Sequence, residues 1–317
     1  MRERVYAFAA SALSPTRSAC SFTSLGDFFQ RPLKPGVRPI DSTCAVVSPA
    51  DCKVLTVGCT QDDVVLQVKG LPYSLSALLG AASAPRPGCS THYCVLYLAP
   101  GDYHRFHSPT SVNVSSQLSP APMLQPAVIY VTVAEMHAFC RRAAARQPTR
   151  RLQGLASLRV QHCAPRGHST GILSQHAQVP SLFVRNERAC ILGTWALKGM
   201  DNGAVGEGLK FGMAAVGAYN VGGITLICNP SLQSNTSQDD GLFDGGAVRS
   251  VVDIKPDVSL AAGDMVGSFR IGSTLVLAVE VPDHWNFSFA CKSGDKMRVG
   301  QALGRVDPAF AAAAAAK

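Results

Sequence analysis

The stretch Gly267-Ser-Phe-Arg-Ile-Gly-Ser-Thr-Leu-Val-Leu-Ala-Val-Glu280 decides the fold of this chain. Its continuous apolar run, Leu275–Val281, is rich in aliphatic and β-branched residues and predicts a buried strand. A Gly-Ser-Thr step stands directly before that strand, and Gly272 permits a tight or strained backbone there. Ser273 on such a turn could act as a nucleophile, although Gly-Ser-Thr is also common in ordinary turns. The rest of the chain has to decide between these two interpretations.

The composition allows one large core and limits the kind of membrane contact. The chain has 317 residues, of which 47% are hydrophobic and only 16% are charged. It holds no run of about 18 apolar residues, so a membrane-spanning helix is not predicted and any membrane contact should be peripheral. Eleven cysteines occur without a C-x-x-C pair, which predicts neither a zinc site nor a disulfide framework. Residues 1–26 are rich in serine and arginine and weakly resemble a mitochondrial transit sequence.

The positive charge is confined to one segment. Residues 136–186 carry eight arginines and no acidic residue, which equals the net charge of +8 of the whole chain. The remainder is balanced, so no nucleic-acid partner is predicted. One hypothesis is that these arginines bind an anionic membrane surface, at about 1 kcal/mol for each basic residue near the surface. The alternative is a solvated loop.

The densest cluster of ionisable groups is Ala99-Pro-Gly-Asp-Tyr-His-Arg-Phe-His-Ser-Pro109. If the segment is extended, Asp102 and His104 share a face, and a turn could bring His107 to join them. A His-x-x-His pair can bind a metal, but no third ligand stands nearby, and no metal is predicted. The two imidazoles are either structural or serve as general acids and bases. Asp51, at the entrance to a predicted strand, is either an Asx-turn residue or a partner of this cluster.

Blocks in the same order along the chain are similar to phosphatidylserine decarboxylase, over roughly residues 27–109 and 181–306. They are Phe28–Ile40, Ser48–Val54, Tyr97–Pro109, Asn186–Arg188, Val216–Gly222 and Gly263–Thr274. The resemblance implies a β-rich α+β fold with a large antiparallel core and few helices. We therefore expect an N-terminal arm at 1–40 and a catalytic domain at 41–317, with a divergent basic insert at about 115–179.

The resemblance also implies a self-cleaving enzyme with a pyruvoyl cofactor. Ser273 would attack the carbonyl of Gly272, and an N-to-O acyl shift would give an ester. Elimination would then separate a β subunit, 1–272, from an α subunit, 273–317. Hydrolysis of the resulting dehydroalanine would leave a pyruvoyl group and release ammonia. That group would form a Schiff base with phosphatidylserine, release CO₂ and yield phosphatidylethanolamine.

Roles for the individual residues follow from the same resemblance. His107 is the expected base for Ser273, with Asp51 and Asp102 as orienting carboxylates. His104 is the expected proton donor after CO₂ is lost. The α and β fragments should stay together. The site of action should be membrane-associated and mitochondrial, at the inner membrane, with endomembranes as the alternative. A homodimer is left open.

The chain departs from the family pattern in two places, and three alternative functions remain compatible with its motifs. Cys52 follows Asp51 where the family usually has glycine, and the insert does not resemble the family. A serine hydrolase using Ser273, His107 and Asp51 would keep its chain intact, but it lacks the G-x-S-x-G elbow. A carrier-like binding module would use Lys296 in the hairpin-type segment Gly294–Gly304. A decayed, uncleaved relative is the third alternative, and the intact site residues argue against it.

Overall fold

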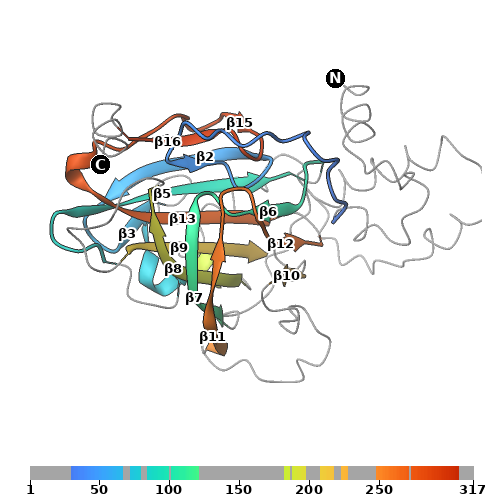
Figure 1. The fold of residues 1–317 in the computed structure, drawn as a ribbon. Helices are drawn as coiled ribbons and strands as arrows, with labels where there is room; N and C mark the ends of the chain where they lie inside the picture. Colours follow the sequence, from blue (N-terminus) through green and yellow to red (C-terminus); the bar gives the residue numbers. More distant parts are fainter. Residues whose placement is uncertain are drawn as a thin grey trace, which may run out of the picture.

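The structure is a computed structural model, and strands dominate it (Figure 1). It describes residues 30–66, 72–79, 84–99, 101–120, 182–185, 188–197, 208–217, 223–227, 248–270 and 273–306. Within these ranges no helix is long and apolar enough to cross a membrane.

One antiparallel sheet of eight strands forms the centre of the molecule. In spatial order its strands are β11 (Val248–Leu260), β7 (Ser111–Pro120), β8 (Arg188–Ala196), β9 (Leu209–Gly217), β13 (Ser273–Pro282), β5 (Cys89–Leu98), β2 (Cys52–Thr60) and β15 (Lys296–Met297). Apart from β8 and β9, which follow one another along the chain, neighbours in this sheet come from distant parts of the sequence, so their order is determined mainly by tertiary pairing.

Smaller elements surround this sheet. The first small sheet contains β1 (Val46–Val47), β16 (Ala302–Arg305) and β14 (Ser288–Phe289); the second contains β10 (Ile224–Leu226), β12 (Met265–Phe269) and β6 (Arg105–His107); the third pairs β3 (Val64–Leu66) with β4 (Pro72–Ser74). The described helices are α3 (Leu75–Leu79), α6 (Leu182–Arg185) and the 3₁₀ turn η3 (Asp283–Trp285). The predicted β-rich α+β fold with a large antiparallel core is confirmed.

The apolar run Leu275–Val281 lies in the central strand β13. Ten consecutive residues of β13 pair with β5 and seven pair with β9. Because side chains alternate along a strand, Leu275 and Leu277 enter one core while Val276 and Ala278 enter a second core on the opposite face. Burial on both faces explains why the run is apolar at every position.

Two details differ from the sequence prediction. Gly294–Gly304 does not form a hairpin, because β15 pairs with β2 at the edge of the large sheet whereas β16 lies between β1 and β14. Lys296 is therefore part of a sheet edge. Residues 115–120, placed in the predicted insert, continue β7 and pair with β8 and β11. Residues 121–179 lie outside the described part of the chain.

Candidate functional site

The strand register places the Asp–His motif beside the Gly-Ser-Thr step. On one side of the step, Ser273 pairs with Leu98, the last residue of β5. On the other side, the backbone N–H of Phe269 donates to the carbonyl oxygen of His104 at 2.8 Å. Residues 99–104 therefore connect two strands that hold both flanks of residues 270–272. Gly272 lies outside the described residues, and only the backbone pairing of Ser273 is described.

The extended backbone of β6 separates the two histidines. Alternation puts His104 and Phe106 on one face, and Arg105 and His107 on the other. Burial agrees with this, because His104 and Phe106 are fully buried while Arg105 and His107 are partly exposed. The turn that would bring His107 to the side of Asp102 and His104 is not formed, since residues 105–107 pair with β12.

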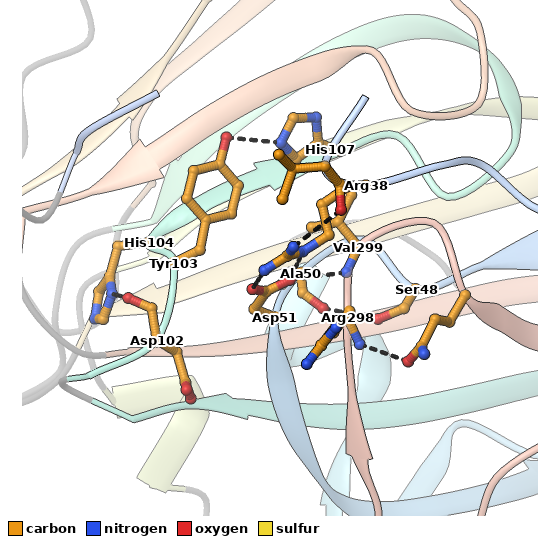
Figure 2. A network of polar contacts seen from close by, with 12 residues as sticks. Arg38, Ser48, Ala50, Asp51, Asp102, Tyr103, His104, His107, Arg298 and Val299 are labelled. Carbon is orange, nitrogen blue, oxygen red and sulfur yellow. Dashed lines mark hydrogen bonds and ion pairs between the residues drawn. The ribbon is translucent and has the colours of Figure 1, made fainter. Parts of the chain in front are cut away.

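His104 is a neutral imidazole held by the backbone of its own loop. Its Nδ1 lies 2.8 Å from the carbonyl oxygen of Asp102 (Figure 2). A carbonyl oxygen can only accept, so Nδ1 carries the proton and donates it. Burial lowers the pKa of His104 to about 4. At neutral pH its Nε2 therefore has a lone pair rather than a proton.

His107 is held on both sides by groups that are not carboxylates. Its Nδ1 donates to the carbonyl oxygen of Gly263 at 2.8 Å. The Tyr103 hydroxyl donates to its Nε2 at 3.0 Å, as Figure 2 shows. The Tyr103 and His107 rings are also stacked, with centroids 5.7 Å apart. Burial lowers the pKa of His107, and the bond to Gly263 opposes this only in part. This imidazole is therefore neutral at pH 7, with a fixed tautomer.

Asp102 places its carboxylate at the turn that leads out of β5. The backbone N–H of Ala99 donates to Asp102 Oδ2 at 2.9 Å. Burial raises the pKa of the Asp102 carboxyl to about 6, although the bond from Ala99 acts in the opposite direction. Asp102 thus has a pKa close to neutrality, which suits a group that takes up and releases a proton.

Asp51 joins three distant segments. Arg38, in the N-terminal arm, donates from Nε and Nη2 to the two carboxylate oxygens at 2.9 and 2.5 Å, and the backbone N–H of Val299 donates to Oδ1 at 2.9 Å (Figure 2). In the predicted arrangement Asp51 and Asp102 orient His107. In the structure the Asp51 carboxylate instead binds Arg38 and Val299, and the Asp102 carboxylate binds the N–H of Ala99. The carbonyl of Gly263 makes the orienting contact instead.

Cys52 does not displace Asp51. It is the first residue of β2, its side chain is buried in the main core, and its thiol lies 3.8 Å from the Ser48 hydroxyl. Burial raises the pKa of this thiol to about 12. Among the described residues, Asn286 is the only non-glycine with a positive φ, so the backbone at Cys52 needs no glycine.

Sequence reasoning missed two kinds of site residue. Tyr103 stands inside the Asp–His motif but has no predicted role, and a tyrosine four residues before a histidine could have signalled a contact. Arg31 and Arg38 are arginines of the arm that are almost completely buried. Burial lowers the pKa of Arg31, while the nearby Asp51, Tyr103 and Asp102 favour its charge. Buried cations in so uncharged a chain usually accompany buried carboxylates.

The described residues contain no group of three or more His, Cys, Asp or Glu side chains that could hold a metal. A pyruvoyl group needs a serine that follows the cleaved bond, and here that serine begins the central strand beside the Asp–His loop. The residues present therefore fit a group made from the chain itself.

Comparisons with known proteins point to one family. The family model "Phosphatidylserine decarboxylase" matches residues 25–125 and 157–305. Mitochondrial phosphatidylserine decarboxylase proenzymes of Cricetulus griseus and Caenorhabditis elegans are 30% and 32% identical to this chain, each over 89% of it and over 60% and 59% of their own lengths. A corresponding proenzyme of Toxoplasma gondii is 31% identical over 91% of this chain and 55% of its own length. The chain thus spans about 60% of these relatives, and residues 126–156 are the internal stretch without a match.

Proposed function

This chain belongs to the phosphatidylserine decarboxylase family, and we propose that it decarboxylates phosphatidylserine to phosphatidylethanolamine after cleaving itself between Gly272 and Ser273. One observation carries the proposal for this chain. The two strands that flank residues 270–272 are bonded to the ends of the loop that contains Asp102 and His104.

Self-cleavage requires a base for the Ser273 hydroxyl. In the proposed step, Ser273 Oγ bonds to the carbonyl carbon of Gly272 while its proton passes to the neutral Nε2 of His107. The peptide C–N bond then breaks, and His107 returns the proton to the Ser273 nitrogen, which leaves an ester. Two observations support this role for His107. Its lowered pKa leaves the imidazole neutral at pH 7, and the bond from Nδ1–H to Gly263 leaves Nε2 as the nitrogen that can accept a proton. Asp51 has an indirect, structural role in this step. Its carboxylate connects the N-terminal arm to the C-terminal segment through hydrogen bonds from Arg38 and Val299.

The decarboxylation step uses the opposite face of β6. A pyruvoyl group formed from Ser273 would supply the electron sink for the loss of CO₂. We assign His104 as the group that delivers a proton to the carbon left behind. Asp102 stores that proton, since its pKa of about 6 is nearer neutrality than the pKa of about 4 of His104.

Association of the fragments follows from the sheet. After cleavage, the α fragment would still contribute β13, β15 and β16, each paired with strands of the β fragment. The new ends would be held by sheet hydrogen bonds and burial. We therefore propose that the two fragments remain one folded unit.

Membrane attachment and location are further proposals. Relatives named mitochondrial support a mitochondrial location. A position at the inner membrane and a homodimer stay predictions. The arginines of residues 141–166, outside the described residues, are proposed to bind anionic lipid. Deleting 141–166 should reduce binding to phosphatidylserine vesicles at low salt. Unchanged binding, or binding insensitive to salt, would contradict the proposal.

Intact-mass spectrometry of the purified chain tests the function directly. The native chain should give two fragments separated between Gly272 and Ser273, with a pyruvoyl group at the start of the smaller one. Ser273→Ala should stay intact and inactive on phosphatidylserine vesicles. An intact native chain that hydrolyses esters would support the serine-hydrolase alternative instead.

Two histidine variants separate the assigned roles. His107→Ala should block cleavage, whereas His104→Ala should cleave and then fail to decarboxylate. The reverse result would exchange the roles, and the backbone bond between His104 and Phe269 makes that outcome worth testing.

A further inference from the structure

We propose that Tyr103 is a positioning residue for His107, which keeps the imidazole in its Nδ1-protonated form by donating its hydroxyl proton to Nε2. The inference rests on the proposed function only in giving His107 the task of a base. It assigns to a tyrosine and a backbone carbonyl the orienting work that a carboxylate performs in a Ser-His-Asp triad.

The Gly263 carbonyl is a fixed acceptor. Gly263 lies in the turn between β11 and β12 with φ +89°, a conformation that favours glycine. Its N–H donates to the Ser108 carbonyl at 2.8 Å, and the Ser108 N–H donates to the Asp264 carbonyl at 2.7 Å. A Cβ at position 263 would lie 2.7 Å from Ile40 Cδ1, so the arm packs directly on this turn. The acceptor for Nδ1 is thus held by backbone on two sides.

The Tyr103 hydroxyl is a fixed donor on the opposite edge of the ring. Tyr103 is buried, and burial raises its pKa to about 12, so it keeps its proton across the physiological range. Stacking on the His107 ring restricts the tyrosine further. A neutral imidazole between one acceptor and one permanent donor can satisfy both only as the Nδ1–H tautomer. That tautomer leaves Nε2 without a proton of its own, so Nε2 can take up the serine proton in exchange for the Tyr103 hydrogen bond.

Charged groups around His107 come from every neighbouring segment and do not supply this orientation. They are Arg105 on β6, Asp264 before β12 and Asp51 before β2. The first disfavours a protonated His107 and the other two favour it. None of them takes the place of Tyr103, because the ring nitrogens of His107 form hydrogen bonds with Gly263 and Tyr103.

The test is an NMR titration of His107 in the full chain carrying Ser273→Ala, so that no cleavage is needed. Tyr103→Phe keeps the ring and removes the donor. Since the donor stabilises the neutral imidazole, its loss should raise the midpoint of the His107 titration by about 0.5 to 1 pH unit. The same variant should lose the fixed tautomer seen in the nitrogen chemical shifts. Replacing Tyr103 by 3,5-difluorotyrosine gives a stronger donor and should move the midpoint downward.

Tyr73→Phe is the matched control. Tyr73 is another buried tyrosine, in the core on the other face of the sheet, and its hydroxyl has no hydrogen-bond partner within the described structure. Its removal should leave the His107 titration unchanged. With Ser273 restored, the acidic limb of the cleavage rate should shift in Tyr103→Phe by the same amount as the NMR midpoint.

The inference would be overturned if the His107 titration and tautomer were the same with tyrosine, phenylalanine or 3,5-difluorotyrosine at position 103 of the Ser273→Ala chain. Tyr103 would then be a packing residue. Because that measurement uses the uncleavable chain, its result is independent of the proposed function. A chain that shows the NMR shift but never cleaves would instead contradict the function.

Discussion

Asp102→Asn should make the protein more stable and less active. The pKa of this carboxyl is about 6 in the folded chain, against an ordinary value of 3.8. A difference of about 2 in pKa corresponds to about 3 kcal/mol, which is the upper limit of the penalty for holding the charged carboxylate in the fold. Asparagine removes the charge, and its side-chain oxygen can still accept the N–H of Ala99.

The stabilisation should depend on pH in one direction. Between about pH 4 and pH 6 the folded chain binds more protons at Asp102 than the unfolded chain does, so its free energy of unfolding falls as pH rises through this range. The penalty is complete above about pH 6 and absent below about pH 4. Asp102→Asn should therefore gain up to about 3 kcal/mol at pH 7.5 and almost nothing at pH 4.

Urea unfolding of the uncleavable Ser273→Ala chain, with and without Asp102→Asn, measures this at both pH values. Asp62→Asn is the control, because Asp62 is exposed and its neutralisation should change little at either pH. Equal effects of Asp102→Asn at pH 7.5 and pH 4, or a loss of stability at pH 7.5, would refute the reasoning. Decarboxylation by the cleavable Asp102→Asn chain should fall, since the stored proton is lost.

Two other substitutions test the scaffold. Glu280→Gln should cost about 3 to 5 kcal/mol at pH 7, because Glu280 is buried and accepts bonds from the Arg86 side chain, the Arg86 N–H and the Lys210 N–H. Burial alone would raise the pKa of Glu280, but these bonds lower it overall. The stabilisation that ionised Glu280 adds to the free energy of unfolding should therefore be complete above about pH 4.3, and it should be lost as pH falls through the lower pKa of the folded state. A loss below about 1 kcal/mol in urea unfolding would contradict this. Gly267→Ala should slow or block self-cleavage, because the added Cβ would lie 2.4 Å from the Thr225 carbonyl oxygen and force β12 away from β10; normal cleavage, timed on a denaturing gel, would show that the position of β12 is not required.

The sequence was sufficient for the elements whose signals are local. The apolar run at Leu275–Val281 predicted a buried strand, and β13 is that strand, buried on both faces. The segment Gly294–Gly304 shows the limit of local signals. Its glycines and short apolar positions are compatible with a hairpin, and only pairing with β2 and with β1 and β14 separates its two halves.

The candidate site divides in the same way. The sequence by itself identified the family, because family motifs are contiguous in the chain, and it predicted the site residues Asp51, Asp102, His104, His107 and Ser273. Only the tertiary structure decided which groups these side chains contact. The extended β6 strand turns the two imidazoles to opposite faces, Gly263 reaches His107 across 156 residues, and Arg38 reaches Asp51 from the arm. Hydrogen-bond partners that distant are selected by the packing of strands, and no local pattern of residues encodes them.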